Sequence, residues 1–326
     1  MLSSSLRGMM VLTAAMVATA VQAQPTPYRH VDGWAKFPAG RPFGSMVSAS
    51  VAPDGTLWVF ERCGENTCAA SNLAPVLAFD PSGNLVKSFG AGLFVFPHGL
   101  ATDRDGNVYV TDADGKDGKG HTVVKFSPDG KVLMTLGRQG VAGATEETFN
   151  RPSSVVVAAN GDIFVADGHG GDSNARIVRF RRDGTFIKAW GSRGAGPGQF
   201  AELHCIGIDS QGRVIVCDRG NSRIQVFDQD GRFITEWKHF GRPTGLFIDA
   251  RDNMYVTDTE SGGKRVAGSK RGIWIASAKD GTVTAFIPDG GLNPTVSDAP
   301  EGVAVDTAGN VYAAETNGRT LRKYAK

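Results

Sequence analysis

The chain has 326 residues and a formal net charge of +2, with 35 lysines and arginines against 33 aspartates and glutamates. Hydrophobic residues make up 41% of it, which is enough for a folded core, so the 43 glycines indicate turns and not disorder. The balanced charge, with no basic run and no aromatic residues interleaved with basic ones, argues against a nucleic-acid-binding protein.

The first residues have the pattern of a secretory signal peptide. Arg7 supplies a positive charge, residues 9–21 are apolar or small, and the small-x-small triplet that ends at Ala23 is typical of a cleavage site. We therefore expect residues 1–23 to be removed and residues 24–326 to form one periplasmic or secreted domain. An uncleaved anchor is the alternative, and no later apolar run is long enough for a membrane helix.

One phrase then recurs six times: a turn, a strand of β-branched and aromatic residues, and an acid. The acids stand 51, 55, 51, 40 and 57 residues apart and are Glu61, Asp112, Asp167, Asp218, Asp258 and Glu315. Repeats of this length, each with four short strands, are typical of propeller blades. The sequence therefore predicts an all-β fold, a six-bladed β-propeller, and residues 218–227 resemble an NHL repeat.

The second repeat shows how a blade is divided. Its predicted strands, from the inner to the outer, are residues 98–102, 107–112, 122–127 and 131–136, joined by turns. The glycine-rich stretch after the second strand fails the spacing of a calcium loop, because Lys116 stands where a ligand is needed. We interpret this stretch as a turn.

The two ends of the mature chain predict how the ring closes. The sixth repeat ends after its third strand, residues 320–325. Residues 30–37 read like an outer strand, similar to residues 185–190. We expect this N-terminal strand to complete the sixth blade, which closes the ring and removes an exposed edge.

Four cysteines fit an oxidising compartment. Cys63 and Cys68 flank a short loop, and Cys205 and Cys217 stand on either side of a predicted turn. We expect each pair to form a disulfide, although four cysteines permit three pairings and free buried thiols are the alternative.

The inner strands line the channel of a propeller, so they are where its chemistry is expected. Counting back eight residues from the turn of each repeat gives Val47, His98, Ser153, His204, Thr244 and Glu301. Blades two, four and six thus supply His98, His204 and Glu301, which a six-fold ring places about 120° apart. Two histidines and a carboxylate with an open position are typical of catalytic zinc and non-haem iron. Polar residues lining a wet channel are the alternative.

Residues directly after each second strand should surround the same mouth of the channel. Arg62, after Glu61, could bind a carboxylate or an oxyanion there, or form a surface ion pair. His169, in a glycine-rich loop, could act as an acid or base, or be a solvated loop residue.

Several segments together resemble the peptidyl-α-hydroxyglycine α-amidating lyases, over most of the mature chain. They are residues 60–64 (Phe-Glu-Arg-Cys-Gly), 96–100 (Phe-Pro-His-Gly-Leu), 165–168 with 176–177, and 217–219 with 223–225. Those enzymes are six-bladed propellers that use zinc to cleave a carbinolamide into a peptide amide and glyoxylate. The resemblance implies that His98 and His204 bind zinc and that Arg62 is catalytic.

The chain departs from this family at four positions. The third zinc histidine of the family falls at Glu301, and its catalytic tyrosine falls near His169. The aspartate that helps to hold structural calcium falls at Gly302, so bound Ca²⁺ is in doubt. The family partner position of Cys217 holds Val226. Zinc remains the expected metal, with Fe²⁺ as the alternative.

Three functions remain open. The first is a monomeric, metal-dependent lyase that acts on a carbinolamide-like small molecule or peptide, with the metal on His98, His204 and Glu301, Arg62 holding a carboxylate and His169 transferring a proton. The second is a non-enzymatic propeller that binds a protein or a glycan. The third is a lactonase-type hydrolase, which the single carboxylate among the six channel positions argues against.

Overall fold

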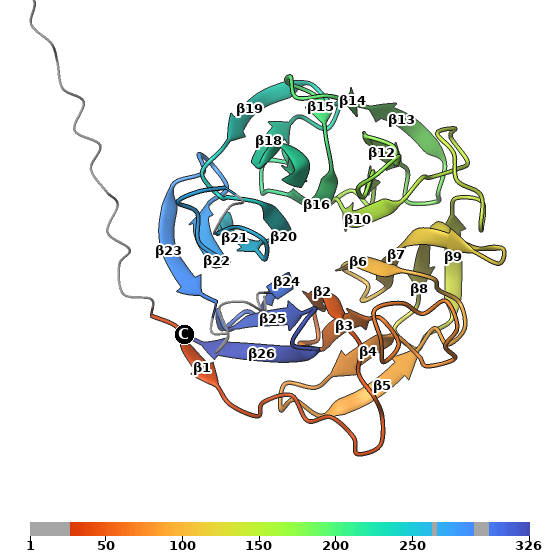
Figure 1. The fold of residues 1–326 in the computed structure, drawn as a ribbon, viewed down its shortest axis with the longest axis vertical. Helices are drawn as coiled ribbons and strands as arrows, with labels where there is room; N and C mark the ends of the chain where they lie inside the picture. The colour runs from red at the N-terminus through yellow and green to blue at the C-terminus, as the bar shows by residue number, and fades with distance from the viewer. Residues whose placement is uncertain (1–26, 263–265, 290–299) are drawn as a thin grey trace, which may run out of the picture.

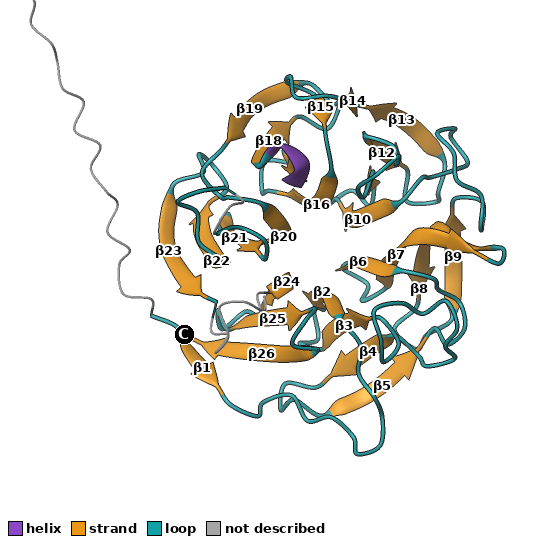
Figure 2. Cartoon of the chain, viewed as in Figure 1, coloured by secondary structure: helices purple, strands orange, loops and turns teal. Residues whose placement is uncertain are grey.

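Six four-stranded antiparallel sheets surround a central axis (Figure 1) in the computed structural model, which describes residues 27–262, 266–289 and 300–326. The predicted signal peptide, residues 1–23, lies outside the described residues. Within these ranges the chain is almost entirely strand and loop (Figure 2), and η1 (Arg219–Asn221) is a single 3-10 turn. No helix in the described part of the chain meets the length and apolarity needed to span a membrane.

Each blade has four strands, which run in chain order from the axis to the rim in blades one to five. The strands of blades one to three are β2 (Met46–Val51), β3 (Leu57–Glu61), β4 (Val76–Phe79) and β5 (Leu85–Phe89); β6 (Pro97–Thr102), β7 (Val108–Lys116), β8 (Lys119–Phe126) and β9 (Val132–Leu136); and β10 (Pro152–Val157), β11 (Ile163–Asp167), β12 (Arg176–Phe180) and β13 (Phe186–Trp190). The strands of blades four to six are β16 (Leu203–Ile208), β17 (Val214–Asp218), β18 (Arg223–Phe227) and β19 (Phe233–Trp237); β20 (Pro243–Ile248), β21 (Asn253–Asp258), β22 (Gly272–Ser277) and β23 (Val283–Pro288); and β24 (Pro300–Val305), β25 (Val311–Glu315), β26 (Thr320–Ala325) and β1 (Arg29–Val31). Two short strands, β14 (Ser192–Arg193) and β15 (Gln199–Phe200), pair in parallel between blades three and four.

The hydrophobic core is divided among the junctions between blades. Each of six clusters of buried side chains draws on two neighbouring blades, and the last one joins blade six to blade one. The alternating apolar residues of each sheet face the blades on either side, so every blade buries both of its faces. The predicted six-bladed propeller is therefore confirmed.

In blades one to five, the recurring acid anchors the segment that leads into the inner strand. The Glu61 carboxylate accepts a hydrogen bond from the Gly44 N–H at 2.7 Å, and the Asp218 carboxylate accepts one from the Ala201 N–H at 3.0 Å. Asp112, Asp167 and Asp258 accept equivalent bonds from the segment that enters their own inner strand. The acids thus fix where these five inner strands begin, because a buried carboxylate needs such donors.

The ring closes in blade six, as predicted, but through a shorter strand than expected. Arg29 pairs with Ala325 and Val31 pairs with Lys323, and β1 then ends. The predicted strand, residues 30–37, instead leaves the sheet after a turn, and Trp34 packs on Tyr312 with ring centroids 4.9 Å apart. Its far end forms an isolated bridge to the outer strand region of blade one, so this segment links the first and last blades.

The glycine-rich stretch of blade two extends a hairpin, which corrects the prediction of a simple turn after residue 112. Strands β7 and β8 continue to Lys116 and from Lys119, and the turn between them consists of Asp117 and Gly118. Both turn residues have positive φ angles, 52° and 75°, which aspartate and glycine tolerate and a tight hairpin requires. The stretch was missed because it has little β propensity.

Both predicted disulfides are present. Cys63 is bonded to Cys68 in the loop after β3, and Cys205 is bonded to Cys217 across β16 and β17. All four cysteines of the chain are used in this way.

Candidate metal centre at the channel mouth

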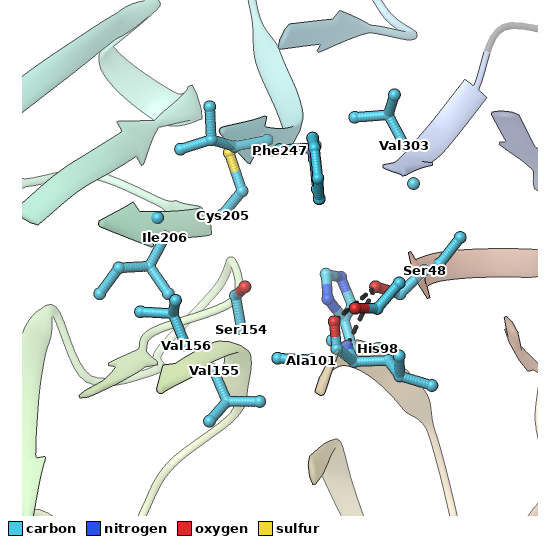
Figure 3. Close-up of a pocket in the computed structure, with 18 of the residues that line it drawn as sticks. Ser48, His98, Ala101, Ser154, Val155, Val156, Cys205, Ile206, Phe247 and Val303 are labelled. Atoms are coloured by element: carbon cyan, nitrogen blue, oxygen red, sulfur yellow. Dashed lines mark hydrogen bonds between the residues drawn. The ribbon is translucent and has the colours of Figure 1, made fainter. Parts of the chain in front are cut away.

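The predicted inner-strand positions line one central cavity of about 300 Å³. Figure 3 shows side chains from the inner strands, among them Val156, Ile206, Phe247 and Val303, arranged around its open centre. Each inner strand has a register shift within the two or three residues after its first paired residue, next to the predicted channel position. The channel residues are Val47, His98, Ser153, His204, Thr244 and Glu301, as expected.

His98 and His204 are held in the same way by the next blade along the chain. The Nδ1–H of His98 donates to the carbonyl oxygen of Ser153 at 2.7 Å, and the Nδ1–H of His204 donates to that of Thr244 at 2.6 Å. A carbonyl can only accept, so these bonds assign the proton to Nδ1 and leave a lone pair on each Nε2. Both Nε2 atoms are buried and have no hydrogen-bond partner among the described residues.

Glu301 approaches both histidines from blade six. Its Oε1 atom lies 3.6 Å from Nε2 of His98, 4.0 Å from Nε2 of His204 and 3.7 Å from Nη2 of Arg62. Burial raises the pKa of the Glu301 carboxyl, and the charges of Arg62 and Arg219 oppose that shift. The structure therefore brings the three residues predicted from the repeat register together at one point.

His169 joins the same group from the loop after β11. Its ring centroid lies 4.3 Å from that of His98 and 5.2 Å from that of His204. The ring is partly exposed, but its Nδ1 atom is buried and has no hydrogen-bond partner in the described chain. One nitrogen from each of the three imidazoles lies within 4.8 Å of the other two. His169 thus faces the centre and is not a solvated loop residue.

Burial makes these imidazoles hard to protonate. It lowers the pKa of His98 and His204 well below the usual value, and their histidine and arginine neighbours lower it further. For His169, burial and the charges of Arg219, Arg62 and Arg151 lower the pKa to about 3. All three rings are therefore neutral near pH 7, and three unpartnered lone pairs beside a carboxylate form a donor set that fits a divalent transition metal.

Arg62 is fixed beside the centre. Its Nε–H donates to the Pro97 carbonyl at 3.0 Å, and its Nη1 donates to Asn66 Oδ1 at 2.6 Å. Its guanidinium carbon lies 3.8 Å from the centroid of the Phe96 ring. The side chain is 5% exposed, so a cation is held at the inner end of the mouth, where an anionic group could reach it.

Arg219 is a second buried arginine at this mouth, and the sequence analysis did not single it out. Its Nη2 lies 2.7 Å from Oε1 of Glu202, and its Nη1 lies 3.6 Å from Oε1 of Glu260. Its charge reaches the centre, where it adds to the lowering of the His204 pKa and opposes the rise in the pKa of Glu301 that burial causes. The sequence could have indicated Arg219, because it directly follows the acid of its repeat, as Arg62 does.

Position 302 has no room for a side chain. A Cβ atom on Gly302 would stand 2.5 Å from Cα of Ser48 in blade one, closer than real Cβ contacts come. The carboxylate that would help to hold calcium in the amidating lyases has no place at this junction, and we assign no calcium site here.

Comparisons with known proteins agree with the fold. A family model described as a 6-bladed β-propeller matches residues 145–253, and the NHL repeat model matches residues 94–126. Human NHL repeat-containing protein 3 is 29% identical over 342 residues, which is 99% of this chain and 91% of that protein.

Higher identity extends over less of the chain. Peptidyl-α-hydroxyglycine α-amidating lyase 1 of Drosophila melanogaster is 41% identical over 120 residues, which is 36% of this chain and 20% of that enzyme. Among solved structures, a gluconolactonase from Xanthomonas campestris superposes with a TM-score of 0.61 at 16% identity, over 93% of this chain and 96% of that one, which supports the fold alone. The chain is thus a six-bladed β-propeller with NHL repeats, and its relatives include peptidyl-α-hydroxyglycine α-amidating lyases.

Proposed function

We propose that this protein is a secreted, metal-dependent lyase that cleaves a carbinolamide-like substrate carrying a carboxylate. The observation that carries the proposal is the convergence of His98, His204 and Glu301 from alternate blades, with two unpartnered Nε2 atoms and one carboxylate oxygen within 4.0 Å of both. The similarity to amidating lyases supports the reaction class. The two disulfides fit an oxidising compartment.

A metal held by His98, His204 and Glu301 would supply Lewis-acid polarisation of a substrate oxygen. Arg62 and Arg219 flank this point as buried cations, and they would orient the substrate through its carboxylate. Because Nδ1–H of each channel histidine donates to a backbone carbonyl, the ring is held in one orientation and its Nε2 atom faces the metal position before the substrate binds.

The reaction breaks the bond between the carbinol carbon and the amide nitrogen. The hydroxyl loses its proton as the carbon becomes an aldehyde, and the leaving nitrogen gains a proton to become a primary amide. Glu301 and His169 are the titratable groups at the centre besides the two channel histidines. Besides helping to hold the metal, the Glu301 carboxylate would accept the hydroxyl proton.

The first test is the metal content of the mature protein, purified without chelator or affinity tag. Elemental mass spectrometry should find about one zinc or iron per chain, and a His98→Ala/His204→Ala double variant should contain none. The metal-loaded protein should then release glyoxylate from α-hydroxyglycine peptides, and the double variant should not. A wild-type protein that binds no stoichiometric metal even after reconstitution would contradict the proposal.

A non-enzymatic propeller is the second candidate. The relative whose similarity extends along 99% of this chain, NHL repeat-containing protein 3, has a name that states a repeat and no reaction. A protein of that kind would present its blade faces to a protein or glycan partner, and its channel would stay free of metal after reconstitution.

A further inference from the structure

We infer that His169 is a metal ligand, so that the centre has three imidazoles and the Glu301 carboxylate as donors. The inference rests on the proposed metal function and adds a fourth blade to the site. Blades two, three, four and six would then each supply one donor.

The positions of the nitrogen atoms support this assignment. Ligand nitrogens about 2.1 Å from one tetrahedral ion stand about 3.4 Å apart. The three imidazole nitrogens here already lie within 4.8 Å of one another. The rings are tilted, with interplanar angles of 61°, 65° and 54°, so they are not stacked on one another. A movement of about one ångström would complete the geometry.

The buried Nδ1 atom of His169 has no hydrogen-bond partner among the described residues. Nε2 of His98 and Nε2 of His204 are likewise buried without a hydrogen-bond partner in the described chain. Three buried polar nitrogens without partners are unfavourable, and a cation bound by all three, with the His169 proton on Nε2, removes that cost.

The backbone around His169 is shaped to hold the ring in this place. The Arg151 carbonyl accepts hydrogen bonds from the N–H groups of both Gly168 and His169, at 3.0 and 2.9 Å. Arg151 has a positive φ of 67°, although it precedes a proline. A Cβ atom on Gly168 would stand 2.3 Å from the Asn174 carbonyl oxygen. A side chain at position 168 would therefore displace the loop and its histidine.

A fourth protein donor changes which metals suit the centre. Zinc with four protein ligands is coordinatively closed, as in structural sites. An open position for substrate then requires a five- or six-coordinate ion, and Fe²⁺ accepts both imidazole and carboxylate ligands. Cobalt bound to the wild-type protein should accordingly give the weak visible absorption of a five- or six-coordinate ion, and not the intense absorption of a tetrahedral one.

The deciding experiment is cobalt reconstitution of a His169→Cys variant. Nδ1 lies close to the backbone, so a thiolate on Cβ reaches nearly the same point. If position 169 binds the metal, the variant gains a near-ultraviolet thiolate-to-cobalt charge-transfer band that the wild type lacks. The control is His239→Cys, which replaces a histidine that contacts the Gly281 carbonyl and should give no band.

A His169→Ala variant provides the second readout. We expect the cobalt dissociation constant to rise at least about tenfold, because one ligand is lost. Unchanged cobalt affinity in His169→Ala, with no new band in His169→Cys, would overturn the inference. If the wild type binds cobalt and the His98→Ala/His204→Ala variant does not, that result leaves the proposed function standing. A wild type that binds no cobalt removes both.

Discussion

Blades two and four each carry a histidine at the same position of the inner strand, His98 and His204. The residue after each histidine is held to the second strand by a different kind of contact. In blade two, Thr111 Oγ1 accepts the Gly99 N–H at 2.7 Å and donates to the Ser153 carbonyl at 3.2 Å. In blade four, the two equivalent positions hold Cys205 and Cys217, which form a disulfide. The hydroxyl bond and the disulfide both connect the inner strand to the second strand at the register shift next to the histidine, where the regular strand pairing is interrupted.

The difference between the two blades follows from their neighbours. A Cβ atom on Gly99 would stand 2.7 Å from the carbonyl oxygen of Ser153 in blade three, so a cysteine does not fit there. The hydroxyl of Thr111 instead ties blade two to blade three, through the same carbonyl that orients His98. Both imidazoles bond to the next blade, but only the carbonyl that orients His98 accepts a second hydrogen bond from its neighbour's hydroxyl, whereas His204 stands beside a covalent link within its own blade.

Removing the blade-four link should have the largest effect on stability. A Cys205→Ala/Cys217→Ala variant opens a loop with a sequence separation of 12 and should lose about 3 kcal/mol of unfolding free energy in urea titrations. The Cys63→Ala/Cys68→Ala variant, with a separation of 5, should lose less. Metal affinity should change little in the first variant, because His204 keeps its bond to Thr244. Equal losses in the two variants would contradict the comparison.

Removing the blade-two hydroxyl should cost less stability and more metal affinity. Thr111→Val keeps the shape of the side chain but leaves the Gly99 N–H unpaired, for about 1–2 kcal/mol. His98 also loses support for its Ser153 partner, so we expect metal affinity to fall about tenfold. The comparison variant is Thr257→Val in blade five, where the hydroxyl accepts the Gly245 N–H at 2.6 Å and donates to the Glu301 carbonyl at 3.0 Å. It should lose similar stability, and any loss of metal affinity in it would act through Glu301 and not through His98.

The recurring acid of blade two, Asp112, should make the stability of the protein depend on pH. In blade four, Asp218 accepts hydrogen bonds from Arg223 and Asn221, whereas no salt bridge joins Asp112 of blade two to a cation among the described residues. Burial raises the pKa of Asp112 to about 7, against about 3.9 in the unfolded chain. Between these values the folded protein binds a proton that the unfolded chain releases, so stability falls as pH rises.

The measurement for this prediction is the unfolding free energy of the wild type and of Asp112→Asn across that range. The wild type should lose up to about 1.4 kcal/mol per pH unit relative to the variant between about pH 4 and 7, and nothing further above that. A constant difference between the two proteins would show that Asp112 titrates normally in the folded state.

The repeat pattern was sufficient to predict much of the site. Six copies of one phrase determine the number of blades, and the spacing within each copy places His98, His204 and Glu301 on inner strands. Side chains on regular strands follow the pleat, so their direction can be read from register. Arg219 follows the same logic, because it occupies the repeat position of Arg62.

The loop residues could not be placed in this way. His169 faces the centre because Arg151 and Gly168 have unusual backbone conformations, and contacts with neighbouring blades stabilise these conformations. The hairpin that ends at Asp117 and Gly118 likewise depends on turn geometry and not on strand propensity. Local conformations of this kind have no periodic signature in the sequence.

The three-residue strand that closes the ring also sets an order of assembly. Arg29 and Ala325 are separated by nearly the whole chain, so their pairing is among the slowest contacts to form. Glu301 belongs to blade six and Arg62 follows the second strand of blade one, on the two sides of the last junction, yet they lie 3.7 Å apart. Before the ring closes, Glu301 and Arg62 belong to the two end blades of an incomplete ring. The appearance of the complete centre during refolding would therefore report the closing of the ring, later than any signal from the blades themselves.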